Sequence, residues 1–320
     1  MFKIGLIGCG AISNGHIMAV DTIDDATIVA ACDISEANLK TACEKTGAKG
    51  YTDYKEMINS EELDLAVITL PHGLHRECAC FCAEKGLDVF LEKPMALSSE
   101  ECKEIIDTCE KNNVMLWVGH LQKYMPTNVF VKNLIDSGEL GELVAFSEVR
   151  NGRYFTERRP KWFGIKSMSG GGIMINLGAH ALDKLKYFSG SEIGEISGSI
   201  HMHEGLDCED GVQAFVKMKN GVVGTITLIG YTDNVDYETI FYLTNGEIRL
   251  QPETDNIVRV YKNGEKLREY PQDEGYGMGM KYQIQDVIRT LREGKKTPAV
   301  DGEYGLDVIH AIKRIYGEEN

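Results

Sequence analysis

The first 120 residues alternate between short apolar runs and longer amphipathic stretches, and this alternation limits the folds that the chain can adopt. Continuous apolar character over about four to eight residues is typical of strands that are buried on both faces. The runs are FKIGLIG (2–8), TIVAACD (27–33), LDLAVITLP (63–71), LDVFLEKP (87–94) and VMLWVGH (114–120). Stretches 35–47 and 98–113 begin with serine and have helical apolar spacing, which predicts capped helices. This order predicts an α/β domain with a doubly wound parallel sheet.

After about residue 190 the pattern changes to strand-like runs joined by tight turns. Three Asn-Gly pairs, 220–221, 245–246 and 263–264, each separate two such runs, and Asn-Gly favours type I′ hairpin turns. With 142–150 as a further strand and 282–294 as a covering helix, this half predicts an α+β domain with an open, largely antiparallel sheet.

A chain of 320 residues exceeds what one compact core usually holds, so we expect two domains. Their predicted ranges are 1–121, for dinucleotide binding, and 122–320, for substrate binding and oligomerisation. The open sheet of the second domain could bury one face against another copy of the chain. We therefore expect a homodimer or homotetramer.

Charge and cysteine content limit the partners and the compartment. A net charge of −15 argues against binding to nucleic acid or anionic membranes, which leaves small molecules. Nine cysteines without an N-terminal export signal or a bilayer-length apolar run predict the cytoplasm. We expect no metal site, because a helix would point Cys80 away from Cys78 and Cys82, and because His201 and His203 have no identifiable third ligand.

The first apolar run ends in a glycine-rich turn. GLIGCGAIS places Gly8, Gly10 and Ser13 at the three marked positions of the G-x-G-x-x-G fingerprint, with Ala11 and Ile12 between them. The glycines allow a tight turn and the close approach of a pyrophosphate to backbone N–H groups at a helix N-terminus. Serine at the third position weakens the match slightly.

Asp33 ends the second apolar run, where dinucleotide-binding domains contact ribose. Its carboxylate can accept hydrogen bonds from the ribose diol but would repel a 2′-phosphate, and no Arg or Lys follows it in CDISEAN. The sequence therefore predicts a Rossmann domain that binds NAD in preference to NADP. A glycine turn that binds no nucleotide is the alternative.

Two polar segments follow the third and fourth apolar runs. TLPHGLHRE and LEKPMAL fall at the carboxyl ends of parallel strands, where open α/β sheets bind ligands. Beside a positively charged nicotinamide, and just after a buried strand, we expect the pKa of the Lys93 ammonium to be lowered. The alternative is an ordinary ion pair between Lys93 and Glu92.

GGGIMINLGAHALD, residues 170–183, combines three glycines with a polar stripe. In a helix, Asn176, His180 and Asp183 would share one face at i, i+4 and i+7. We expect the glycines to let the chain pass close to the nicotinamide and the stripe to face the substrate. The alternative is a half-buried helix whose histidine is only structural.

These motifs occur together in one known family. GCGAIS, LPHGLH, EKP, VGH and GGGIMINLGAHALD follow the order of the glucose-fructose oxidoreductase, inositol dehydrogenase and MocA-like superfamily, which this chain resembles over essentially its whole length. The resemblance implies a dinucleotide-binding domain, an open antiparallel sheet used for oligomerisation, and sugar, inositol or polyol substrates.

The resemblance also implies roles for single residues. Lys93 would contact substrate and cofactor, His180 would be the catalytic histidine, and Trp162 and His75 would lie near the cofactor. With Asn176 added, the predicted catalytic set is Lys93, His180 and Asn176. The predicted cofactor contacts are Gly8, Gly10, Ala11, Ile12, Asp33, Pro71, His72, His75, Glu92, Lys93 and Trp162.

One departure bears on the reaction type. Many members have aspartate where this chain has Asn176, and an amide can orient a hydroxyl or His180 but cannot ionise. Asp183, one turn later, resembles a structural residue. We expect a dehydrogenase that transfers a hydride between nicotinamide and a secondary alcohol. A redox-neutral glycosidase or lyase that keeps NAD, or a non-catalytic dinucleotide sensor, are the alternatives.

Overall fold

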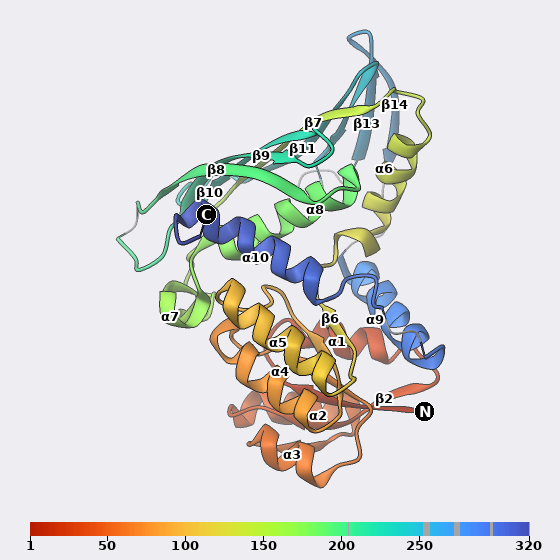
Figure 1. The fold of residues 1–320 in the computed structure, drawn as a ribbon, viewed down its shortest axis with the longest axis vertical. Helices are drawn as coiled ribbons and strands as arrows, with labels where there is room; N and C mark the ends of the chain where they lie inside the picture. Colours follow the sequence, from red (N-terminus) through yellow and green to blue (C-terminus); the bar gives the residue numbers. More distant parts are fainter. Residues whose placement is uncertain (204, 252–256, 272–275, 295–296, 320) are drawn as a thin grey trace. The chain divides into compact units, whose positions relative to one another are not determined.

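The computed structural model describes residues 1–203, 205–251, 257–271, 276–294 and 297–319, and the chain divides into two compact units (Figure 1). The first unit contains Met1–His120 and Tyr276–Leu306, and the second contains Leu121–Gly275 and Asp307–Asn320. Helix α10 (Gly302–Tyr316) runs across the boundary between these ranges.

A six-stranded parallel sheet forms the centre of the first unit. Its strands are β1 (Phe2–Ile7), β2 (Ala26–Cys32), β3 (Lys49–Tyr51), β4 (Leu65–Ile68), β5 (Asp88–Leu91) and β6 (Leu116–Val118). The spatial order β3-β2-β1-β4-β5-β6 is that of dinucleotide-binding Rossmann domains. The predicted fold class is confirmed, although β3 was missed because three residues are too short to show a period.

The helices of the first unit begin and end where their capping residues require. They are α1 (Ser13–Val20), α2 (Glu36–Thr46), α3 (Tyr54–Ser60), α4 (His75–Glu84), α5 (Ser99–Lys111) and α9 (Tyr276–Arg292). Ser35 and Ser98 accept the backbone N–H bonds that start α2 and α5, and Gly47 ends α2 in the left-handed conformation. The two helices predicted from serine caps are therefore confirmed.

Helix α9 differs from its predicted position. Residues 282–294 are almost entirely helical, but Ile284, Val287 and Ile288 belong to the core around β1 and contact the α1 region. This helix covers the parallel sheet and not the antiparallel one, so residues 122–320 do not form a single unit. An amphipathic period shows that a helix has an apolar face but does not show which sheet receives that face.

The second unit contains an eight-stranded, largely antiparallel sheet. Its strands are β7 (Leu143–Asn151), β8 (Ile193–His201), β9 (Gly211–Met218), β10 (Val223–Ile229), β11 (Asp236–Leu243), β12 (Gly246–Leu250), β13 (Ile257–Lys262) and β14 (Glu265–Pro271). The order is β14-β13-β12-β11-β7-β10-β9-β8, and β7 pairs in parallel with β10 and antiparallel with β11. Its helices are α6 (Pro126–Asp136), α7 (Lys166–Ser169) and α8 (Ala179–Ser189).

The two faces of this sheet differ in burial. On β9 the side chains alternate between buried and exposed, as expected for a sheet with one covered face. Helix α8 packs on the covered face, where the ring centroids of Phe188 and Phe241 are 4.4 Å apart. On the opposite face Phe215 and Tyr242 are 45% and 38% exposed.

All three Asn-Gly pairs lie in hairpins, but only one turn has the predicted type. Asn263 and Gly264 both have positive φ, 54° and 80°, and form the two-residue loop of β13 and β14. In the other two hairpins the asparagine has a negative φ, so neither turn is type I′. Dipeptide composition therefore identified the hairpins better than it identified their turn geometry.

Candidate active site

The glycine turn after β1 leaves room for a ligand on one side. Gly8 has φ +93°, and a side chain there would lie 2.7 Å from the Thr69 carbonyl oxygen, so only glycine fits. A side chain at Gly10 would meet nothing within 4 Å. Ser13, at the third position of the fingerprint, donates its hydroxyl to the Gly10 carbonyl at 2.6 Å. The turn therefore fits a pyrophosphate that approaches its backbone.

Asp33 is held beside this turn by two backbone bonds. Its Oδ2 accepts from Cys9 N and its Oδ1 from Ser35 N, both at 2.7 Å. Each carboxylate oxygen has a further lone pair for a hydroxyl donor. The position at the end of β2 and the fixed orientation fit the role of a ribose-binding carboxylate.

Glu92 is bound to His16 of α1. It is buried, its Oε1 lies 2.7 Å from His16 Nε2, and its Oε2 accepts from the backbone N–H of Lys93 at 3.1 Å. Burial alone would raise the pKa of Glu92, but the bond to His16 and nearby positive charge lower it. A side chain at Gly119 would lie 3.0 Å from Oε2. Glu92 thus supports the backbone of the EKP segment, and its contact with the cofactor stays a prediction.

His75 also has a structural role that the sequence did not predict. It is fully buried at the start of α4, with Nδ1 3.0 Å from the Pro94 carbonyl and Nε2 2.9 Å from the Leu70 carbonyl. Each ring nitrogen lies against a carbonyl oxygen, and because burial lowers the pKa of the imidazole, the neutral ring donates to one of the two. His75 connects the segment after β4 to the segment that carries Lys93. Pro71 and His72 lie in that same segment, at the short 3₁₀ turn His72–Leu74.

In the second unit, the glycine triplet is needed for contacts within the protein. A side chain at Gly172 would lie 1.9 Å from the Glu209 carbonyl oxygen, and one at Gly171, where φ is +155°, would lie 2.2 Å from the Tyr316 hydroxyl. Both partners are parts of the same unit. Two glycines of the triplet are therefore required by packing against Glu209 and Tyr316, and the predicted approach of this segment to the nicotinamide stays a prediction.

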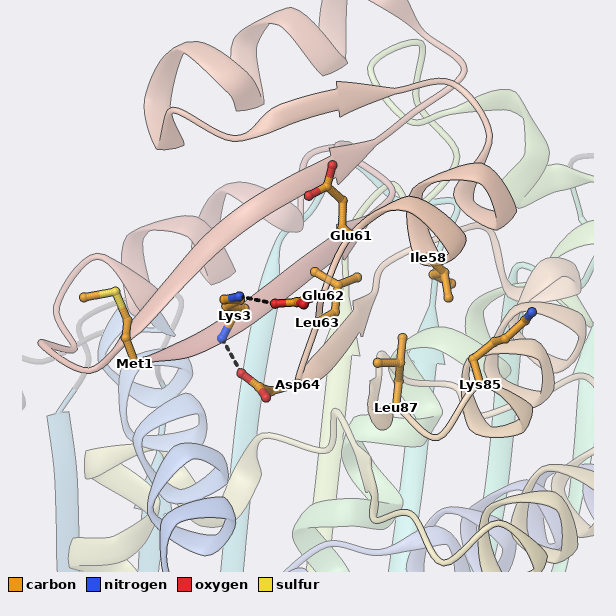
Figure 2. Close-up of a pocket in the computed structure, with 9 residues that line it drawn as sticks. All are labelled: Met1, Lys3, Ile58, Glu61, Glu62, Leu63, Asp64, Lys85 and Leu87. Carbon is orange, nitrogen blue, oxygen red and sulfur yellow. Dashed lines mark hydrogen bonds and ion pairs between the residues drawn. The ribbon is translucent and has the colours of Figure 1, made fainter.

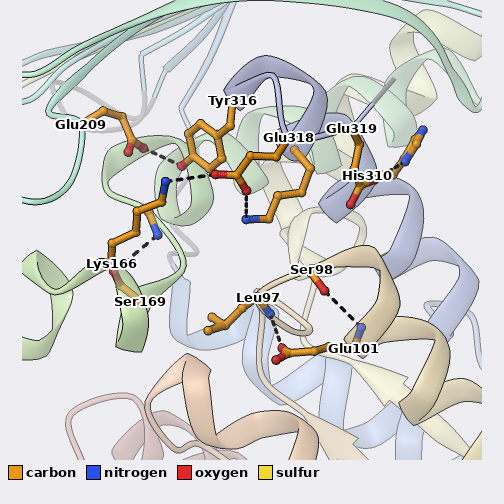
Figure 3. A network of polar contacts seen from close by, with 12 residues as sticks. Leu97, Ser98, Glu101, Lys166, Ser169, Glu209, His310, Tyr316, Glu318 and Glu319 are labelled. Atoms are coloured by element: carbon orange, nitrogen blue, oxygen red, sulfur yellow. Dashed lines mark hydrogen bonds and ion pairs between the residues drawn. The ribbon is translucent and has the colours of Figure 1, made fainter.

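The Glu209 carboxylate caps the helical segment that follows the triplet. Oε2 accepts from Gly172 N at 2.8 Å, and Oε1 accepts from Met174 N at 2.9 Å. Oε1 also accepts from the Tyr316 hydroxyl at 2.7 Å (Figure 3). Burial and this carboxylate raise the pKa of Tyr316, which keeps its hydroxyl a donor. A carboxylate at a helix N-terminus is favoured by the exposed N–H groups and the helix dipole. This N-terminus is therefore filled by the protein's own anion.

The polar stripe lies on a π-helical turn, Met174–Gly178, that continues into α8. Asn176 Nδ2 donates to the Tyr154 hydroxyl at 2.8 Å. His180 Nδ1 lies 3.3 Å from Gln122 Nε2, and Asp183 Oδ2 accepts from the backbone N–H of Gln122 at 3.0 Å. His180 and Asp183 thus share one partner, while Asn176 has another.

Tyr154 and Gln122 were not among the predicted site residues. Tyr154 is buried, and the Arg159 guanidinium lies 4.0 Å from its ring centroid. Gln122 follows the VGH motif by two residues, and this proximity was the one available signal in the sequence. Trp162 lies in the 3₁₀ turn Lys161–Gly164 and stacks on Phe163 with centroids 3.9 Å apart. Its contact with the cofactor stays a prediction.

A groove in the first unit lies away from these residues. It has a volume of about 510 Å³ and is lined by side chains around the starts of β1, β4 and β5 (Figure 2). Lys3 there donates to Glu62 at 2.9 Å and to Asp64 through its backbone N–H at 2.7 Å. Open α/β sheets bind ligands at the opposite ends of their strands, where the glycine turn lies.

Within the described ranges, no cluster of three or more His, Cys, Asp or Glu side chains has the arrangement to hold a metal ion. Of the helices that the structure describes, none combines the length and the apolar character needed to span a bilayer.

Comparison with known proteins agrees with this geometry. Residues 2–120 match the oxidoreductase family with an NAD-binding Rossmann fold, and residues 129–249 match the GFO/IDH/MocA C-terminal domain. The inositol 2-dehydrogenase of Salmonella typhimurium is 33% identical over 144 residues, which are 44% of this chain and 43% of that protein. The 2,7-anhydro-N-acetylneuraminate hydratase of Mediterraneibacter gnavus is 30% identical over 202 residues, 61% of this chain and 52% of that protein.

The chain thus matches about half the length of these curated relatives. The solved WlbA dehydrogenase from Bordetella pertussis, in complex with NADH and UDP-GlcNAcA, is 25% identical, with a TM-score of 0.83 over 99% of this chain and 95% of that one. With family matches to both halves, the chain belongs to the Gfo/Idh/MocA family of NAD-binding oxidoreductases.

Proposed function

We propose that this protein is an NAD-dependent dehydrogenase that oxidises a secondary alcohol of a sugar, inositol or related polyol, or reduces the corresponding ketone. The observation that carries the proposal is the fixed polar set Asn176, His180 and Gln122 in one unit, combined with an NAD-binding domain that carries Lys93 after a parallel strand. The names of relatives, among them an inositol 2-dehydrogenase, support the substrate class.

The proposed cofactor contacts begin at the glycine turn. The backbone from Gly8 to Ile12, including Gly10 and Ala11, would hold the pyrophosphate, and Asp33 would accept bonds from the adenosine ribose. Bound NAD supplies the acceptor for a hydride. The open space at Gly10 and the fixed carboxylate are the features of the chain that fit it. Pro71, His72 and Trp162 remain proposed contacts.

The chain's own side chains would orient the alcohol and move its proton. The Lys93 amine is the proposed proton acceptor, and its ammonium form would donate to the carbonyl oxygen in the reverse direction. Asn176 is proposed to bind a hydroxyl on a neighbouring carbon through its amide, which the bond to Tyr154 holds in place. His180 would contact the reacting oxygen.

The test is the absorbance of reduced nicotinamide when purified protein meets NAD or NADP and a panel of sugars, inositols, their acids and their phosphates. A rise with NAD and one substrate class supports the proposal. Lys93→Ala and His180→Ala should each abolish the rise while NAD affinity, measured by calorimetry, changes little. A near-normal rate in either variant would remove that residue from the mechanism.

A redox-neutral reaction is the second candidate. Asn176 stands where many members have aspartate, and one relative is named a hydratase, a class of enzyme whose reaction adds or removes water without net oxidation. Mass spectrometry of the reaction mixture decides between the two. A product that differs from its substrate by water, with no net reduced nicotinamide, would replace the dehydrogenase by this second candidate.

We also propose that the open face of the eight-stranded sheet pairs with a second copy of the chain. Phe215 on β9 and Tyr242 on β11 are exposed on the face opposite α8. The cross-strand register places Phe215, Thr225, Ser147 and Ile240 in one row, and Tyr242 lies two residues after Ile240. Sedimentation velocity should show a dimer or tetramer that Phe215→Glu weakens. A monomeric wild-type protein at micromolar concentration would refute this proposal.

A further inference from the structure

Two buried side-chain amides, linked by a hydrogen bond, lead to His180. Asn128 on α6 donates from Nδ2 to two oxygens of Gln122, the backbone carbonyl at 3.0 Å and the side-chain Oε1 at 2.9 Å. Gln122 Nε2 in turn lies 3.3 Å from His180 Nδ1. Asn128 and Gln122 are only 4% and 7% exposed, so water is poorly placed to replace these bonds.

The donor and the acceptor in each hydrogen bond that links Asn128, Gln122 and His180 can be assigned by starting from the Gln122 backbone carbonyl. A backbone carbonyl can only accept, so the group of Asn128 that faces Gln122 must be the NH₂ group. That same NH₂ group faces the Gln122 side chain, whose near atom must therefore be Oε1. The far atom, which faces His180, is then Nε2, a donor. The reverse orientation of Gln122 would place two buried donors 2.9 Å apart.

Gln122 is also held through its backbone N–H. Its N–H donates to Asp183 Oδ2 at 3.0 Å, and Asp183 lies one turn after His180 on α8. The backbone N–H and carbonyl of Gln122 are thus both bonded, and its amide cannot turn over without breaking the bond to Asn128. This gives Asp183 a role in the site through Gln122.

We propose that Asn128 and Gln122 fix neutral His180 as the tautomer with a lone pair on Nδ1 and the proton on Nε2. His180 then acts as a hydrogen-bond donor to the reacting oxygen and not as its general base. Gln122 and Asn128 are positioning residues, because they act through His180. The catalytic meaning of this inference rests on the proposed function, but the tautomer itself does not.

The inference determines where the proton goes. In the oxidation direction bound NAD would supply the hydride acceptor, and the hydroxyl proton must leave to a group other than neutral His180, since its Nε2 already carries a proton. The Lys93 amine takes it and becomes an ammonium ion. The imidazole keeps its proton throughout and stabilises the developing alkoxide by hydrogen bonding. In the reduction direction the Lys93 ammonium returns the proton.

The test is ¹⁵N nuclear magnetic resonance of the full chain labelled at histidine, recorded without substrate at a pH where imidazoles are neutral. The chain has eight histidines, so the His180 signals are assigned from their loss in His180→Gln. We expect a pyridine-like Nδ1 and a protonated Nε2. In Gln122→Glu the carboxylate can only accept, and Nδ1 should become protonated. Asn133→Asp, which adds the same charge at an exposed position on α6, should leave the His180 signals unchanged.

A protonated Nδ1 in the wild-type protein would overturn the inference. If Gln122→Glu fails to fold, Asn128→Ala gives a second test, because it frees the Gln122 amide to turn over and should populate both tautomers. An unchanged single tautomer in folded Asn128→Ala would also overturn it. None of these measurements needs a substrate, so failure of the proposed dehydrogenase activity would not be mistaken for failure of the tautomer assignment.

A substrate found with the panel adds a kinetic test. Loss of one preorganised donor to a developing oxyanion typically costs roughly 10²- to 10³-fold in kcat. Gln122→Glu should therefore lower kcat by roughly that factor with a much smaller change in KM. An unchanged kcat with the switched tautomer would exclude the role as a donor.

Discussion

Substitution of Glu209 by glutamine should loosen the segment that carries Asn176 and His180. The carboxylate accepts three buried hydrogen bonds, two from backbone N–H groups of 172 and 174 and one from Tyr316. An amide oxygen can keep the pair at Oε1, but its NH₂ group then faces the N–H of Gly172, donor against donor. A bond to a charged acceptor contributes about 1.5–3 kcal/mol, and the buried N–H loses its partner as well.

We therefore expect Glu209→Gln to lower the free energy of unfolding by about 3 kcal/mol, or the melting temperature by roughly 6–12 °C. Hydrogen exchange followed by mass spectrometry should localise the effect to amides near residues 172–178. Tyr316→Phe is the matched control, because it removes one of the three bonds and keeps the carboxylate. It should cost about half as much. A melting temperature within about 2 °C of wild type, with unchanged exchange, would refute the capping role of Glu209.

Three further predictions concern His75, Lys184 and Asp33. Burial lowers the pKa of His75 below the ordinary 6.5, so the unfolded chain binds a proton that the folded chain does not. The contribution of neutral His75 to the free energy of unfolding is fully present above pH 6.5 and is lost as the pH falls below that value. His75→Gln should therefore make the melting temperature fall less steeply between about pH 7.5 and about pH 5.5. Lys184→Met removes the ammonium group that lies 3.1 Å from the buried Glu148 carboxylate, and it should lower the free energy of unfolding by about 3–5 kcal/mol. Adding Glu148→Gln to the same chain should recover most of this loss, as thermal unfolding would show. Asp33→Ala should reduce the preference for NAD over NADP about tenfold in calorimetric titrations, and an unchanged ratio would show that Asp33 does not contact the ribose.

Features that depend on neighbouring residues were readable from the sequence. Serine caps, the apolar runs and Asn263-Gly264 determine local backbone preferences, and these predicted the two sheets, two helices of the first unit and one turn type. The fingerprint glycines were readable for the same reason, because a positive φ at Gly8 is a property of one residue.

Features that depend on residues far apart in the chain were not readable. Gly172 packs against Glu209, 37 residues later in the chain, and one partner of His180 is Gln122, 58 residues before it. Helix α9 has the predicted apolar period, but it packs on the parallel sheet and not on the antiparallel sheet as expected. Periodicity and capping are local, since they follow from backbone dihedral angles and nearest neighbours. Which carboxylate meets which N–H, and which nitrogen of an imidazole keeps its proton, is decided only when packing brings distant side chains together.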